Sequence, residues 1–184
     1  MVMISGGTNL LDATGILERF GIAQGSMIAD FGCGGAGHFV FPTARLVGEK
    51  GVIYAVDILE PVLSALASKA RSDGFTNIKT VQSNIEVVGA TKIPEASLDA
   101  VLIINLLFQN TKYADILREA ARLLKPQTRI LVIEWKPSGG TVFAPPPSQR
   151  VAPITVKQAA QAAGLEFQEE FAAGVYHYGL ILSK

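Results

Sequence analysis

A glycine-rich turn between a predicted strand and a predicted helix constrains the fold of this chain most strongly. Residues 28–37 read Ile-Ala-Asp-Phe-Gly-Cys-Gly-Gly-Ala-Gly. The pattern predicts a strand over 26–31 that ends at this turn and a helix that runs from Gly37 to Val47 and stops at Gly48. Glycines allow a ligand to approach the backbone closely, and a helix N-terminus offers free N–H donors. The turn therefore predicts a site of nucleotide size.

Short apolar segments alternate with amphipathic ones along the rest of the chain. Further strands are expected over 51–57, 77–82, 98–104 and 129–135, and further helices over 8–20, 61–72, 111–124 and 155–163. Thr8 or Asn9 is the expected cap of the first helix, and residues 165–184 read as two strands joined by a tight Ala-Gly turn. This order is typical of an α/β protein with a mostly parallel sheet, helices on both faces and a C-terminal antiparallel hairpin.

The chain has 184 residues, which suits one domain with one core. Residues 83–97 read as a loop. Residues 136–149 lack any hydrophobic period and contain three consecutive prolines, so we expect a functional lid or substrate loop over 137–150.

Composition excludes several classes of function. The formal net charge is zero, and no lysine or arginine run indicates a nucleic-acid surface. Cys33 is the only cysteine, so an intrachain disulfide is impossible, and one cysteine with two distant histidines gives no metal signature. The N-terminus has no signal-peptide pattern, and the apolar run 101–108 is too short to span a bilayer. We therefore expect a cytoplasmic protein.

Asp30 decides between two interpretations of the glycine turn. The sequence from Gly32 to Gly37 matches G-x-G-x-x-G, the fingerprint of dinucleotide sites. However, a carboxylate at the end of the first strand would repel a pyrophosphate. A cofactor with a cation and no phosphate, such as S-adenosylmethionine, suits Asp30 better.

Four motifs in order carry a resemblance to a known family. They are Ile28-Ala-Asp-Phe-Gly-Cys-Gly34, the acidic Asp57 after Val-Ile-Tyr-Ala-Val, the segment Leu98–Asn105, and Leu123-Leu-Lys-Pro126 leading to Ile130–Trp135. Over nearly its whole length the chain resembles class I S-adenosylmethionine-dependent methyltransferases. Within them it is most similar to small enzymes related to the ubiquinone/menaquinone-biosynthesis C-methyltransferases. The resemblance implies a Rossmann-like, mostly parallel seven-stranded sheet.

The resemblance also implies roles for particular residues. Asp30 would bind the ammonium side of the cofactor, Asp57 both ribose hydroxyls, Asn84 and Ile85 the adenine edge, and Asn105 the methionine part. The implied cofactor-binding set is Asp30, Gly32, Gly34, Gly37, Asp57, Ile58, Asn84, Ile85 and Asn105.

Three positions depart from the family pattern. Ala36 stands where a third glycine is usual, so the register of Gly35 to Gly37 is open. Asn84 replaces a frequent acidic residue, although its amide oxygen can still accept a hydrogen bond. Gln127-Thr128 replaces a frequent Gly-Gly after Lys-Pro.

The acceptor side of the site is less defined by sequence. Trp135 and Lys136 lie where the fifth strand ends, beside the expected substrate pocket. They either line this pocket or have no contact with the substrate. Arg150 either anchors the lid or binds an anionic substrate. His177 either packs in the hairpin or reaches the mouth of the site, and His38 and Cys33 are weak candidates for catalysis, so no residue is assigned as catalytic.

The expected reaction is methyl transfer by in-line displacement. The absence of an appended domain and of basic charge favours a small-molecule acceptor over nucleic acid or a large protein, and a protein side chain stays open as an acceptor. Two alternatives stay open: a NAD(P)-dependent oxidoreductase that uses the literal G-x-G-x-x-G, and a non-catalytic cofactor-binding partner subunit. Sequence does not decide between a monomer and a homodimer.

Overall fold

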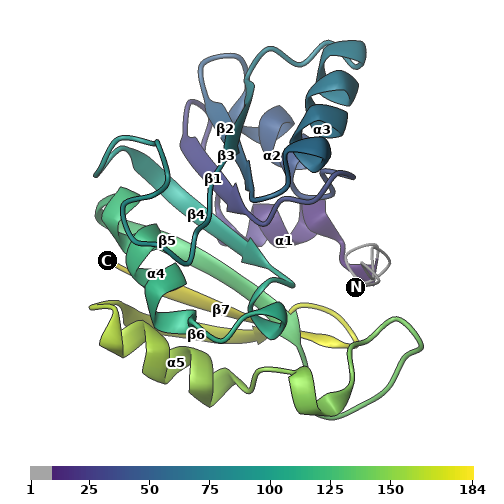
Figure 1. Ribbon diagram of the computed structural model, residues 1–184, viewed down its shortest axis with the longest axis vertical. Coiled ribbons are helices and arrows are strands. Elements are labelled where there is room, and N and C mark those ends of the chain that lie inside the picture. Colours follow the sequence, from purple (N-terminus) through teal and green to yellow (C-terminus); the bar gives the residue numbers. More distant parts are fainter. Residues whose placement is uncertain (1–9) are drawn as a thin grey trace.

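The computed structural model of the chain describes residues 10–184 (Figure 1). Within that range no helix is long and apolar enough to cross a membrane. The helices are α1 Ala13–Phe20, α2 Val40–Val47, α3 Glu60–Ser72, α4 Tyr113–Leu123 and α5 Pro153–Ala162, with the short 3₁₀ turns η2 Leu107–Gln109 and η3 Pro147–Gln149. The strands are β1 Met27–Phe31, β2 Val52–Asp57, β3 Ile78–Gln82, β4 Leu98–Ile104, β5 Leu124–Trp135, β6 Glu166–Ala172 and β7 His177–Ser183.

The seven strands form one sheet in the order β3-β2-β1-β4-β5-β7-β6. The first five strands pair in parallel, and β7 is antiparallel to both β5 and β6. The predicted seven-stranded sheet with its C-terminal hairpin is thus confirmed. Strands are added outward in one direction from β1 to β3 and in the other direction from β4 onward, so the strand order reverses between β1 and β4. Ligands of open α/β sheets bind outside the carboxyl ends of the strands at such a point.

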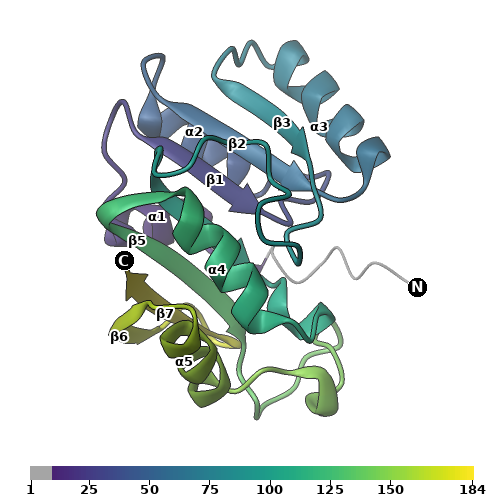
Figure 2. The same cartoon turned by 60° about the vertical axis from the view of Figure 1, so that its left-hand side comes forward.

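Helices cover both faces of the sheet (Figures 1 and 2). On one face α1, α2 and α3 bury a core with Leu17, Phe20 and Leu66 against β1 and β2. On the other face α4 and α5 bury a second core around Ile116 and Val156. Both faces of β4 are therefore covered, which is why its sequence is a continuous apolar run.

Two predicted helix starts are wrong. The first helix begins at Ala13, because the Asp12 carboxylate caps it by accepting a hydrogen bond from Gly15 N at 3.1 Å. The proposed caps Thr8 and Asn9 lie outside the described residues. The second helix begins at Val40, because Gly37 has a φ of +61° and cannot continue a right-handed helix.

Two further differences concern the edges of elements. Strand β5 begins at Leu124, where the chain pairs with Leu98, and not at residue 129; a register shift follows before Arg129 pairs with Ala100. The 3₁₀ turn η2 after β4 was not predicted from sequence. It matters for the site because only Leu106 separates it from Asn105.

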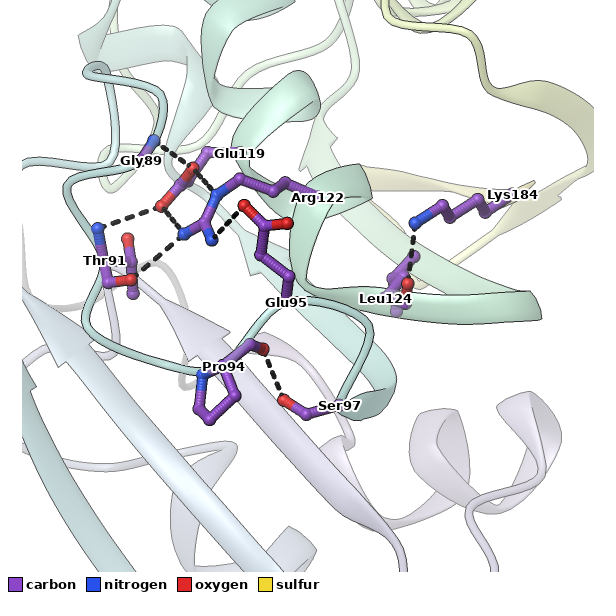
Figure 3. A network of polar contacts seen from close by, with 9 residues as sticks. All are labelled: Gly89, Thr91, Pro94, Glu95, Ser97, Glu119, Arg122, Leu124 and Lys184. Atoms are coloured by element: carbon purple, nitrogen blue, oxygen red, sulfur yellow. Dashed lines mark hydrogen bonds and ion pairs between the residues drawn. The ribbon is translucent and has the colours of Figure 1, made fainter.

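An ion pair between a buried glutamate and a partly buried arginine fastens the loop between β3 and β4 to α4 (Figure 3). The fully buried Glu119 carboxylate accepts hydrogen bonds from Gly89 N at 2.7 Å, from Thr91 N at 2.9 Å, and from Arg122 Nε and Nη2 at 2.9 and 2.8 Å. Arg122 Nη2 also donates to Thr91 O. This network holds the loop that carries Asn84 and Ile85.

Candidate cofactor and acceptor site

The carboxyl ends of β1, β2 and β4 bring most of the predicted cofactor residues to one edge of the sheet. Asp30 lies near the end of β1, Asp57 ends β2, and Asn105 follows β4 directly. The glycine turn is held at this edge because Gly32 N donates to Val56 O at 2.8 Å and Gly34 N to Asp57 Oδ2 at 3.3 Å. The turn and the Asp57 carboxylate therefore form one unit.

Three glycines of the turn are needed for different reasons. Gly34 has a φ of +63° and open space where a Cβ would stand. At Gly32 a Cβ would come within 2.6 Å of Leu106 Cδ1, and at Gly37 within 2.5 Å of Leu66 Cδ1. Gly34 is thus the glycine whose missing side chain leaves room for a ligand, whereas Gly32 and Gly37 are also required by packing.

Asp30 is a buried carboxyl group with 3% of its surface exposed. Among residues 10–184 no hydrogen-bond donor reaches its carboxylate. Burial, and secondly the nearby Asp57 charge, raise the pKa of Asp30 to about 8. A buried acid without a donor is unfavourable for folding and frequent at functional sites.

Asp57 uses both of its carboxylate oxygens on the backbone. Oδ2 accepts from Gly34 N, and Oδ1 accepts from Leu59 N at 3.0 Å. The neighbouring Ile58 is 56% exposed. The carboxylate therefore lies beside the turn, with an uncovered apolar side chain next to it.

The residues expected at the adenine edge lie after β3. Asn84 is exposed and its Oδ1 accepts from Glu86 N at 3.0 Å, which forms a local Asx turn. Ile85 is 9% exposed and joins the core. The Asn84 amide nitrogen makes no contact in the described part of the chain, so Asn84 keeps its donor for other partners.

Asn105 is held in an unusual conformation. Its φ is +50°, and both polar atoms of its amide are buried without a hydrogen-bond partner in the described region. Its backbone N donates to Ile133 O at 2.8 Å. Strained backbone and unpartnered buried polar atoms are features that proteins retain at binding sites.

Trp135 and His177 lie next to each other at the end of β5 and the start of β7. They face each other in the strand register with ring centroids 4.1 Å apart, and both are buried. Both ring nitrogens of His177 are without a partner within 10–184. Burial, and secondly the Lys136 charge, lower the pKa of His177 to about 4, so the ring is neutral at neutral pH.

Lys136 and Arg150 hold the long loop after β5. Lys136 Nζ donates to Gly174 O and Val175 O in the β6–β7 loop. Arg150 donates to Lys136 O, Gly139 O and Pro145 O. Of the two roles predicted for Arg150, its contacts are those of a lid anchor.

His38 and Cys33 have contacts that argue against catalytic roles. His38 Nε2 donates to Leu11 O at 2.9 Å. Burial, followed by the charges of Asp30 and Asp57, raises the pKa of the Cys33 thiol, which disfavours a reactive thiolate.

Sequence reasoning missed Glu134. This side chain is fully buried in β5, and its Oε1 accepts from Leu107 N at 2.5 Å. Burial raises its pKa to about 8, although backbone hydrogen bonds, the first from Leu107, act in the opposite direction. The only signal was an acidic residue within the apolar run Ile-Leu-Val-Ile-Glu-Trp.

Two open hollows of about 450 and 280 Å³ lie at the opposite edge of the sheet. Gln127 and Arg129 line both, and residues such as Ser26 and Asp99 mark this edge as the amino ends of the parallel strands. Their linings include none of the buried polar atoms that are without partners. The chemistry therefore points to the carboxyl edge and not to these two hollows.

Comparison with known proteins agrees with this geometry. A family model described as a methyltransferase domain matches residues 22–170. The ubiquinone/menaquinone biosynthesis C-methyltransferase UbiE of Azotobacter vinelandii is 32% identical over 138 residues, which are 74% of this chain and 53% of that protein. The protein of the same name from Photorhabdus laumondii is 34% identical over 131 residues, 70% of this chain and 49% of that protein. The chain spans about half the length of these curated relatives.

Solved structures agree with the fold. An S-adenosylmethionine-dependent methyltransferase from Aquifex aeolicus superposes with a TM-score of 0.87 at 23% identity, over 97% of this chain and 92% of that one. A putative type 11 methyltransferase from Sulfolobus solfataricus gives 0.75 at 22% identity, over 95% and 93%. Together with the family model, these likenesses place the chain in the methyltransferase domain family, among the class I S-adenosylmethionine-dependent methyltransferases.

Proposed function

We propose that the chain transfers a methyl group from S-adenosylmethionine to a small-molecule acceptor, with Asp30, Asp57 and Asn105 as the main polar contacts of the cofactor. The observation that carries these roles is the buried Asp30 carboxyl, which has no hydrogen-bond donor among residues 10–184 and lies beside an open glycine turn. A cation suits this position, and the unpartnered Asn105 amide can hydrogen-bond a polar ligand. The residues present therefore fit the cofactor that the family uses.

The remaining cofactor contacts follow from the same edge of the sheet. The backbone at Gly32, Gly34 and Gly37 would lie along the cofactor, and Asp57 would accept from the ribose hydroxyls in place of its backbone donors. Ile58, Asn84 and Ile85 would enclose the adenine. Each of these groups stands on the carboxyl side of β1, β2 or β3.

The proposed mechanism requires little acid–base chemistry from the protein. When bound, S-adenosylmethionine supplies a methyl group that is already activated on a sulfonium. The chain contributes binding and alignment through Asp57 and Asn105, and exclusion of water by the loop over 137–150. Arg150 fixes the base of that loop through three backbone carbonyls.

Strand order indicates where the acceptor would bind. A cofactor that contacts Asp57 on β2 and Asn105 after β4 leaves β5 and β7 as the next strands along the sheet. Trp135 ends β5, Lys136 follows it, and Arg150 donates a hydrogen bond to Lys136 O. These three residues are our candidates for the acceptor side. The relatives are named as C-methyltransferases of ubiquinone and menaquinone biosynthesis, so a carbon atom is the methyl acceptor that we would test first.

Calorimetric titration separates this function from an oxidoreductase. We expect S-adenosylmethionine and S-adenosylhomocysteine to bind with micromolar affinity and NAD(H) not to bind, because Asp30 would face a pyrophosphate. Tight binding of NAD(H) without binding of S-adenosylmethionine would refute the proposal. Binding without turnover of any acceptor would instead support a non-catalytic partner subunit.

Cofactor affinity should rise with pH if the ionised Asp30 binds a cation. Asp30 has a pKa of about 8 without ligand, so below pH 8 binding must release its proton. Between pH 5.5 and 7.5 we expect an affinity gain of up to about tenfold per pH unit, and about one proton released, measured by calorimetry in two buffers. Asp30→Asn should bind with no such slope. A flat profile in the unaltered protein would contradict the role of Asp30.

The raised pKa of Asp30 also predicts that the stability of the ligand-free protein falls as pH rises, whereas cofactor affinity rises. The folded-state pKa of Asp30 lies above its ordinary value of 3.8, so the folded state binds the extra proton between these values. Asp30 therefore lowers the free energy of unfolding as pH rises from about 4 to 8, and Asp30→Asn should remove this loss in the ligand-free protein.

A further inference from the structure

Glu134 connects strand β5 to the segment that follows β4. Its side chain is fully buried. It lies on the sheet face that α4 and α5 cover, because residues two apart in a strand share a face and Ile130 and Val132 belong to that core. Its Oε1 accepts a hydrogen bond from the backbone N of Leu107, the first residue of η2. One buried carboxyl oxygen thus fixes the start of this turn, while Oε2 has no partner within the described residues.

The segment held by Glu134 is the one that presents Asn105. Asn105 and Leu106 lie between the end of β4 and η2. Two side chains at the end of η2 and just after it bind the backbone of these residues: Gln109 Nε2 donates to Asn105 O at 3.2 Å and Asn110 Nδ2 to Leu106 O at 2.8 Å. Leu106 also fills the space beside Gly32, where a Cβ would come within 2.6 Å of its Cδ1. The segment therefore contacts the glycine turn on one side and Glu134 on the other.

We propose that Glu134 is a positioning residue, which holds the segment Asn105–Leu107 so that the Asn105 amide faces the cofactor and Leu106 supports the glycine turn. This inference rests on the proposed function, because it gives Glu134 its effect through a cofactor contact. Without the Oε1 acceptor, Leu107 N would be a buried donor without a partner, and the strained φ of Asn105 would be free to relax.

Four variants and one probe test the proposal. The probe is S-adenosylhomocysteine, and its dissociation constant is measured by calorimetry. Glu134→Met keeps an unbranched side chain of similar length but removes the acceptor oxygen, and should weaken binding about tenfold. Glu134→Gln keeps an acceptor oxygen and, like the side chain at neutral pH, has no charge; it should bind within about twofold of the unaltered protein.

Two variants separate positioning from general destabilisation. Ile130→Val deletes one buried methyl group on the same face of the same strand, four residues away, and should leave affinity unchanged. Leu106→Ala breaks the contact on the other side of the segment and should weaken binding by about fivefold without touching Glu134. Equal affinity of Glu134→Met and the unaltered protein would overturn the proposal, as would an equal loss of affinity in Glu134→Met and Ile130→Val.

A second measurement does not need the cofactor. The Leu107 amide should exchange its hydrogen at least tenfold faster in Glu134→Met than in Glu134→Gln, because only the latter retains the acceptor. Unchanged exchange would overturn the contact itself. If the unaltered protein bound no S-adenosylhomocysteine while the exchange difference persisted, the proposed function would fail and the structural contact would stand.

Discussion

Replacement of Arg122 by alanine should lower the free energy of unfolding by up to about 3–5 kcal/mol, the cost of leaving the buried Glu119 carboxylate without its paired cation. Glu119 has no exposed surface, and Arg122 supplies two of its four hydrogen bonds (Figure 3). Gly89 N and Thr91 N would be its remaining donors. The variant would therefore bury a carboxylate without a compensating cation.

The same helix offers a matched control. Arg118 pairs with Asp115 at the surface, and both side chains are more than a third exposed. Surface pairs at this spacing contribute about 0.3–0.5 kcal/mol, so Arg118→Ala should have a small effect. Urea unfolding at pH 7 measures both. Equal, small losses in the two variants would show that the Glu119 network does not stabilise the fold.

The effect of Arg122→Ala on stability should also depend on pH. Burial alone would raise the pKa of Glu119, but the hydrogen bonds from Arg122, Gly89 and Thr91 outweigh it and lower the pKa to about 2. The pair therefore stabilises the fold above pH 4.5, and this contribution is lost as pH falls towards 2. The difference between Arg122→Ala and the unaltered protein should be smaller at pH 4 than at pH 7, whereas that of Arg118→Ala should stay small throughout.

The centre of the sheet could be predicted from the sequence because strands such as β1 and β4 are apolar and buried on both faces. Strand β4 was predicted with its bounds, since Leu98–Ile104 is buried between two helical layers and no other structure explains such a run. Helix starts are different, because several capping residues compete in one stretch. Asp12 caps α1 although Thr8 and Asn9 had equal claims by residue type, and only the three-dimensional path of the chain decides between them.

The site was predictable to the extent that its residues end strands. Asp30, Asp57 and Asn105 share one edge because the carboxyl ends of parallel strands meet there. Glu119 and Glu134 were not predictable in the same way. Each accepts hydrogen bonds from backbone N–H groups about 30 residues away in the chain, and such contacts leave no motif in the sequence.

The role of His177 also could not be predicted from the sequence. Its position between Tyr176 and Tyr178 allowed either packing or a place at the mouth of the site. In the structure it is buried against Trp135, yet its two ring nitrogens have no partner in the described part of the chain. A residue can thus pack and remain available for a ligand, a combination that residue type alone does not reveal.

Replacement of Asp57 by alanine should weaken S-adenosylmethionine binding roughly 10–150-fold, which corresponds to the loss of about 1.5–3 kcal/mol from a charge-assisted hydrogen bond. The carboxylate stands at the end of β2 beside the open side of Gly34. Calorimetry at pH 7 measures the change, and thermal unfolding checks that the fold persists. Asp73→Ala, which removes an exposed carboxylate that pairs with Lys69, is the control and should bind normally.

Asp57 also holds Gly34 N and Leu59 N, so a loss of affinity could come from a loosened turn. Asp57→Asn separates the two effects, because its amide oxygen can still accept from one backbone donor while one acceptor for the ribose is lost. We expect Asp57→Asn to bind more weakly than the unaltered protein and more tightly than Asp57→Ala. Unchanged binding in both variants would remove Asp57 from the site.

The electrostatic effect of the same substitution has its own readout. The Asp57 charge is the second cause that raises the pKa of Asp30. Without it Asp30 should ionise at lower pH, so the pH dependence of cofactor binding should shift towards acid even as the affinity falls. A weaker isotherm with an unshifted pH profile would mean that Asp57 acts only by contact, whereas a joint change would show that the two carboxylates at the ends of β1 and β2 act together.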